Sequence, residues 1–202
     1  MGKKGVFIFL IPAFLLLLSI SAKRGWKQDT LVSGEKLSGL PENQKKVGAV
    51  EFLTQDAFHK IQVVARTLNG YYSKTFPGLN DEVSNTADVT TRMIMQNAVS
   101  NATYRTFIGC FNPSTSSVTV EFRIYGSDGV QIGNTITRTF VGKDFQSFNL
   151  FTAAGVPYPT YSYDNTWVEI RPVSGTGRVM VFGATANNNT NDPAAHIAVP
   201  VI

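Results

Sequence analysis

Two glutamates, Glu121 and Glu169, are the residues whose type and placement come nearest to hydrolytic chemistry. A paired-carboxylate site needs two acids about 5 to 10 Å apart, with the pKa of one of them raised. Both glutamates lie at polar positions of segments that alternate like β-strands, and each is two residues from an arginine, Arg123 or Arg171. Cross-strand ion pairs explain such residues without catalysis. The pattern therefore favours a protein that is not an enzyme.

Metal and thiol chemistry are restricted by counting, because the chain has two histidines and one cysteine. These numbers exclude a three-histidine zinc site, a CxxC redox pair and an intramolecular disulfide. His59 and His196 are far apart in the sequence, and neither has a nucleophile at a motif spacing such as GxSxG. Cys110 lies in the apolar segment 107–111 and is predicted to be a buried small side chain.

Aromatic residues in the segment 152–167 are the leading candidates for ligand binding. Tyr158, Tyr161 and Tyr163 are separated by turn-forming residues, and Trp167 follows them. Turn formers keep the three tyrosines from all reaching one core, and the favoured interpretation is that their rings cap the open end of the domain. A loop platform for a sugar ring or a protein partner is the alternative.

An asparagine-rich stretch near the C-terminus is a candidate for metal binding. Asn187, Asn189 and Asp192 bring several side-chain oxygens together, and Ca²⁺ takes six to eight oxygen ligands. Asp192 is the only carboxylate in this stretch, whereas a tight calcium site usually has several. An Asx-rich hairpin turn is the favoured interpretation, with weak Ca²⁺ binding as the alternative and no other cofactor expected.

The N-terminus has the pattern of a secretory signal peptide over residues 1–22. Lys3 and Lys4 precede an apolar run of about 13 residues, and small residues follow up to Ala22. Since a membrane-spanning helix needs about 20 residues, cleavage is expected and no span is expected in the mature chain. Residues 23–48 are polar and are predicted to be a linker or arm. The predicted location is secreted, extracellular or at the cell surface of a bacterium, with the periplasm as the alternative.

The rest of the chain, residues 49–202, is predicted to be a single all-β domain. Only 16% of the 202 residues are charged and 43% are hydrophobic, which excludes disorder. Residues 48–202 hold ten Lys or Arg and eleven Asp or Glu, so a nucleic-acid partner is not expected. About nine antiparallel strands in a two-sheet β-sandwich, Ig-like or jelly-roll-like, are predicted, with a closed barrel as the alternative. The predicted strands are 58–68, 89–97, 104–111, 118–125, 130–141, 145–150, 166–171, 178–186 and 194–201.

Two stretches of this domain resemble a β-sandwich accessory module that recurs in secreted bacterial proteins. The first is YRTFIGCFNP at residues 104–113, and the second is NNNTNDP at residues 187–193. The resemblance covers about residues 58–202, and Cys110 stands where the module commonly has an aliphatic residue. It implies a sandwich architecture in an accessory, non-enzymatic role. It does not imply a particular ligand.

These observations predict a non-catalytic structural or adhesive protein that acts by surface contact. The partner would be a second copy, another surface protein or a polysaccharide. The chain ends in an apolar strand that includes Val199, Val201 and Ile202, and such a strand can close its own sheet or be donated to a neighbour's sheet edge. The alternative function is a carbohydrate-binding module that uses the aromatic loop 152–167.

Overall fold

The computed structural model of the protein describes residues 86–201 in full and, before them, the backbone of six strands. The contacts divide the chain into two compact units, Met1–Asn80 and Asp81–Ile202. The strands of the first unit are β1 (Lys4–Phe9), β2 (Leu16–Ala22), β3 (Gly48–Leu53), β4 (Ile61–Asn69), β5 (Tyr72–Pro77) and β6 (Leu79–Asn80).

The first unit contains two antiparallel three-stranded sheets, in the orders β3-β1-β6 and β2-β4-β5. Strands β1 and β2 lie within residues 1–22, the predicted signal peptide, and β4 begins three residues into the predicted strand 58–68. His59 and residues 23–47 of the predicted arm lie outside the described residues. The strands β3, β5 and β6 were not expected from the sequence.

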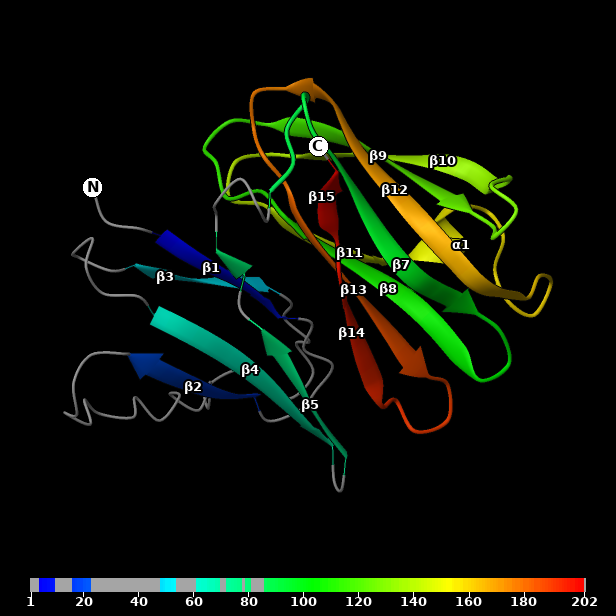
Figure 1. Ribbon diagram of the computed structural model, residues 1–202, viewed down its shortest axis with the longest axis horizontal. Helices are drawn as coiled ribbons and strands as arrows, with labels where there is room; N and C mark the ends of the chain where they lie inside the picture. The colour runs from blue at the N-terminus through cyan, green and yellow to red at the C-terminus, as the bar shows by residue number, and fades with distance from the viewer. Residues whose placement is uncertain are drawn as a thin grey trace, which may run out of the picture. The chain divides into compact units, whose positions relative to one another are not determined.

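The second unit is one open sheet of nine antiparallel strands, with a single short helix among the described residues (Figure 1). Seven strands follow the order β10-β9-β12-β7-β8-β13-β14, while β11 pairs with β8 and β15 pairs with β7. The all-β, antiparallel prediction is confirmed, and the sheet does not close into a barrel. The elements are β7 (Arg92–Ser100), β8 (Tyr104–Phe111), β9 (Val118–Tyr125), β10 (Gln131–Phe140), β11 (Phe145–Asn149), α1 (Leu150–Ala153), β12 (Tyr163–Gly175), β13 (Met180–Asn187), β14 (Pro193–Ile197) and β15 (Val199–Val201).

The hairpin β7–β8 is joined by one pair of residues, Ser100 and Arg105. Beyond this pair each strand changes its neighbour. The same edge of β8 pairs with β11 over residues 107–111, while β7 pairs with β15 over residues 92–94. The nine strands therefore fall into two groups, β10-β9-β12-β7-β15 and β11-β8-β13-β14, whose strand ladders meet at the pair Ser100 and Arg105.

The core is built by strands that bury every second side chain. In β9 the residues Val118, Val120, Phe122 and Ile124 are fully buried, as their alternation predicts. The buried cluster also takes residues from both groups of strands, among them Met93 and Met95 of β7 and Ile108 and Cys110 of β8. Polar side chains at the intervening positions of β9, β12 and β7 consequently share the opposite, outward face.

Asn112 holds the loop after β8 in place from inside the protein. Its side chain is fully buried, and its amide Nδ2 donates to the carbonyl oxygens of Ser116, Phe140 and Val141 at 2.7 to 3.1 Å. Its Oδ1 accepts from the backbone N–H and from the hydroxyl of Ser114. One side chain thus joins the β8–β9 loop to the end of β10.

Candidate functional site

Two facing β-bulges interrupt the β7–β12 ladder. The pairing passes from Ser100 opposite Tyr163 to Ala98 opposite Thr166 and then to Gln96 opposite Trp167. This register leaves an extra residue on each strand. Asn97 and Asn165 both have positive φ, at 61° and 52°, a conformation that asparagine tolerates better than most residues. Bulges of this kind re-aim side chains and are frequent beside functional sites.

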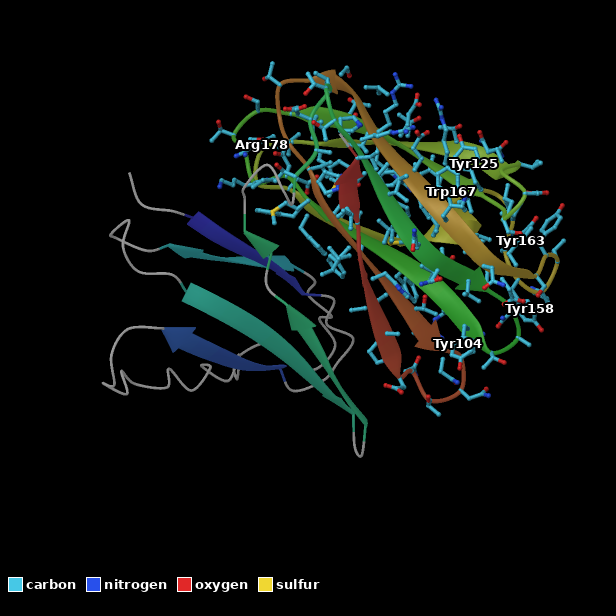
Figure 2. All side chains as sticks on the ribbon, viewed as in Figure 1. Tyr104, Tyr125, Tyr158, Tyr163, Trp167 and Arg178 are labelled. Carbon is cyan, nitrogen blue, oxygen red and sulfur yellow. The ribbon has the colours of Figure 1, made fainter. Side chains whose placement is uncertain are left out.

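The two bulges border a pocket of ≈ 360 Å³ on the outward face of the sheet, lined by Ile94, Gln96, Asn97, Asn165, Thr166 and Trp167. Trp167 lies between this pocket and Tyr125. The ring centroids of Tyr125 and Trp167 are 4.4 Å apart, and their planes are inclined by 18°. Because β12 lies between β9 and β7, Tyr125 covers the β9 side of the indole and leaves its β7 side to the pocket. Figure 2 shows the two rings next to each other on β9 and β12.

The pocket offers neutral polar groups and an aromatic ring. None of its six lining residues is ionisable. Within residues 86–201, the side-chain amides of Gln96, Asn97 and Asn165 make no hydrogen bond to another group. Each amide can both donate and accept a hydrogen bond. The arrangement suits a neutral ligand that has one apolar face and several hydroxyl groups.

On the same outward face of the sheet, ionic side chains of β7, β9 and β12 pair with one another. Glu169 lies 3.0 Å from the guanidinium of Arg92 and 3.8 Å from that of Arg123, which also contacts Glu121 at 2.6 Å. A hydrogen bond with Tyr125, followed by that with Glu121, raises the pKa of Arg123. The predicted cross-strand charge pairs are present for Glu169, whose partners Arg92 and Arg123 lie on the flanking strands β7 and β9. Glu121 instead pairs with Arg123 of its own strand. Both glutamates are engaged by arginines.

The loop aromatics form a second group, separate from the pocket. Tyr161 stacks on Tyr163 with centroids 6.2 Å apart, and Tyr163 stacks on Phe151 at 5.7 Å. Tyr158 and Tyr161 are each 45% exposed, whereas Phe151 is buried. In Figure 2, Tyr158 and Tyr163 lie nearer than Trp167 to the loop that precedes β12. The four aromatic residues singled out from the sequence therefore do not meet in one platform, because Trp167 pairs with Tyr125.

In the asparagine-rich turn, several side-chain oxygens are occupied by N–H donors. Asn187 Oδ1 accepts from the backbone of Asn189 and Thr190, as in an Asx turn. The guanidinium of Arg105 donates to Asn188 Oδ1 at 3.0 Å and to Asn191 Oδ1 at 2.5 Å. The described residues contain no cluster of three His, Cys, Asp or Glu side chains, and Asp192 Oδ1 has no hydrogen-bond partner there. A fixed guanidinium beside these oxygens disfavours a cation.

The C-terminal strand pairs within its own chain. After β14 the chain crosses at Ala198, which is buried and donates to the carbonyl of Val181, and β15 then pairs with β7, with Val199 opposite Ile94 and Val201 opposite Arg92. The single strand predicted over 194–201 is therefore two strands, one in each group. Ile202 lies outside the described residues.

Two titratable side chains lie outside the pocket lining, the half-buried His196 and the buried Cys110. His196 Nε2 lies 2.9 Å from the hydroxyl of Thr185, and desolvation lowers the pKa of this histidine. Cys110 is fully buried, as predicted, and desolvation raises the pKa of its thiol well above the ordinary value. Neither group adjoins the outward face.

The burial of Cys110 predicts a thiol that reacts with Ellman's reagent only after unfolding, because the reagent needs an accessible thiolate. As pH rises above the ordinary pKa, the unfolded thiol ionises while the folded one stays neutral, so the free energy of unfolding should fall. Cys110→Ala should lack this alkaline loss. Rapid labelling of the native protein at neutral pH would show that the thiol is not buried.

Sequence reasoning found Trp167 but missed Tyr125, Gln96, Asn97 and Asn165. Asn97 ends the predicted strand 89–97 and Asn165 directly precedes the predicted strand 166–171, and only the pairing between the two strands brings them to one pocket. The outward position of Tyr125 follows from the alternation of β9. That alternation was the one available signal for the aromatic pair.

No family model and no curated protein matches this sequence. Among solved structures, the structure of infectious bursal disease virus Gx strain is similar, with 14% sequence identity and a TM-score of 0.26. The match covers 98% of this chain, which corresponds to 59% of the viral chain. A likeness at this level carries no argument about function. In the described part of the chain, no helix has the length and apolar character needed to cross a membrane.

Proposed function

We propose that this protein is an exported, non-catalytic β-protein of a bacterium that acts by contact at the cell surface, in a structural or adhesive role. The observation that carries the proposal is the outward face of β9, β12 and β7. Its carboxylates are neutralised by arginines, while its aromatic ring and free amides remain available for contact. Its partner would be a polysaccharide, another surface protein or a second copy.

For the second unit we propose a two-sheet sandwich, Ig-like or jelly-roll-like. The support comes from the corner at Ser100 and Arg105, where both strands of the hairpin exchange neighbours. It also comes from the core cluster, which draws on both groups of strands. Two sheets that face each other across such a core leave their outer faces free for partners.

Export rests on the signal-peptide pattern of residues 1–22. Those residues also supply β1, the middle strand of one sheet in the first unit, and β2, an edge strand of the other. Cleavage after Ala22 would remove both strands, so the mature protein would rely on the second unit for its stable core. The mass of the exported protein therefore also shows whether β1 and β2 are kept in the mature chain.

A carbohydrate-binding role for the loop 152–167 is a second candidate. Tyr158 and Tyr161 favour it, because each exposes 45% of its surface, and Tyr161 is the outermost ring of a stack. This candidate predicts saturable polysaccharide binding that Tyr161→Ala abolishes without loss of fold.

The test is expression of the full chain in a bacterium, followed by fractionation, mass spectrometry and sedimentation with isolated cell envelopes. We expect a product that begins at Lys23, lies outside the cytoplasm and co-sediments with envelopes in a saturable manner. Leu15→Arg, which interrupts the apolar run, is expected to hold the protein uncleaved in the cytoplasm. An uncleaved cytoplasmic wild-type protein, or turnover of a glycan that Glu169→Gln abolishes, would contradict the proposal.

A further inference from the structure

We infer that the pocket between the bulges of β7 and β12 is a binding site for a neutral pyranose unit of a glycan, with Trp167 as the stacking surface. This inference deepens the proposed function and rests on it, because the proposed function places the protein at the cell surface, where it would encounter a glycan. The site lies on the outward face of the sheet, whereas the second candidate above uses the loop aromatics.

The chemistry of the lining selects the ligand class. A pyranose has one face of C–H groups and a rim of hydroxyls, and the indole of Trp167 offers an apolar face for the former. The three unpaired amides of Gln96, Asn97 and Asn165 offer donors and acceptors for the latter. Since the lining has no ionisable residue, a phosphorylated or strongly charged ligand would lose its hydration without gaining a counter-ion.

The site is held rigid before any ligand arrives. Tyr125 stacks on Trp167 from the β9 side, while Arg123 of the same strand is held by Glu121 and Glu169. Asn97 and Asn165 sit on strands rather than on a loop, and their positive φ is imposed by the bulges. Such preorganisation lowers the ordering cost that a weak sugar contact would otherwise incur.

The volume also fits this ligand class. A pocket of ≈ 360 Å³ is at the lower end of the range of small-molecule sites, about 300 to 1,000 Å³. It has room for a sugar ring but not for a folded protein segment. Because the pocket lies on an outer face, the neighbouring units of a chain could continue beyond it.

The test is isothermal titration of the full chain with five neutral hexaoses, namely those of cellulose, xylan, mannan, amylose and chitin. We expect saturable binding of at least one of them and no binding of polygalacturonate. Asn165→Gly deletes the amide but keeps a residue that tolerates positive φ, and it should weaken binding about fivefold to tenfold. Trp167→Ala should weaken binding tenfold or more, with the fold checked by circular dichroism.

Tyr104→Ala is the matched control, because it removes an exposed ring of β8 that belongs neither to the pocket nor to the loop 152–167. Its affinity should equal that of the wild type. The inference is overturned if no neutral hexaose binds, if Asn165→Gly and Trp167→Ala both bind like the wild type, or if Tyr161→Ala alone abolishes binding. Failure of export with intact hexaose binding would instead refute the proposed function alone.

Discussion

Replacing Asn112 by alanine is expected to lower the free energy of unfolding by about 3 kcal/mol, the cost of leaving several buried backbone groups without partners. Asn112 is fully buried, and its amide alone serves three carbonyl groups. The loop after β8 and the end of β10 meet through this side chain. Urea unfolding followed by tryptophan fluorescence measures the change.

Asn149→Ala is the matched control for Asn112→Ala. Asn149 caps the short helix α1 and accepts one hydrogen bond from the backbone of Thr152. Loss of such a cap costs about 1 kcal/mol. If the two variants were destabilised equally, the buried network around Asn112 would not have the structural importance assigned to it.

Gly175→Ala should have an effect of similar size for a different reason. Gly175 has a φ of +93°, and a Cβ there would press on the backbone of Ser117 and Val118, which cannot rotate away. A positive φ costs an L-residue about 1 to 2 kcal/mol, and the backbone clash adds to it, so we expect about 3 kcal/mol in total. Thermal unfolding of the purified variant measures this.

Gly129→Ala separates the two causes at Gly175. Gly129 has a φ of +78°, yet a Cβ there would meet nothing within 4 Å. This variant should lose about 1 kcal/mol, from the backbone conformation alone. Equal losses in the free energy of unfolding would mean that a Cβ at Gly175 does not clash with the backbone of Ser117.

The strands that could be predicted from the sequence are those with strict alternation and clear turns. Strands β8 and β9 have the predicted bounds, and the buried face of β9 follows the alternation of its apolar residues. Period-two burial is a local property, so a local pattern reveals it. Strand β12 is longer than predicted by three residues at its start, where the bulge at Asn165 breaks the alternation, and by four at its end, where a second register shift lies between Pro172 and Ser174.

The partners across strands could not be predicted, since they depend on pairing register. Cross-strand ion pairs were expected for Glu169, but its partners Arg92 and Arg123 on the two flanking strands could not be named from the sequence. The pocket is even less predictable from the sequence, because neither Asn97 nor Asn165 indicates a binding site by itself. Only the shift of register brings both beside Trp167.

The residues that carry the resemblance to a secreted module have structural tasks in this chain. Arg105 ties down the asparagine-rich turn, Asn112 ties the loop to β10, and the ring of Phe182 packs where a side chain at Gly109 would lie. These roles are separate from the outward face proposed for binding.

The central claim is that this protein binds its partner by contact and does not transform it. The most direct measurement is an NMR time course of the protein mixed with a neutral hexaose, in which the signals of both molecules are followed in the same sample. The variant Trp167→Phe assigns the indole N–H signal. The account predicts a saturable shift of the Trp167 indole signal while the hexaose stays intact for days. Cleavage of the hexaose, or an indole signal unchanged by every hexaose of the panel, would contradict it.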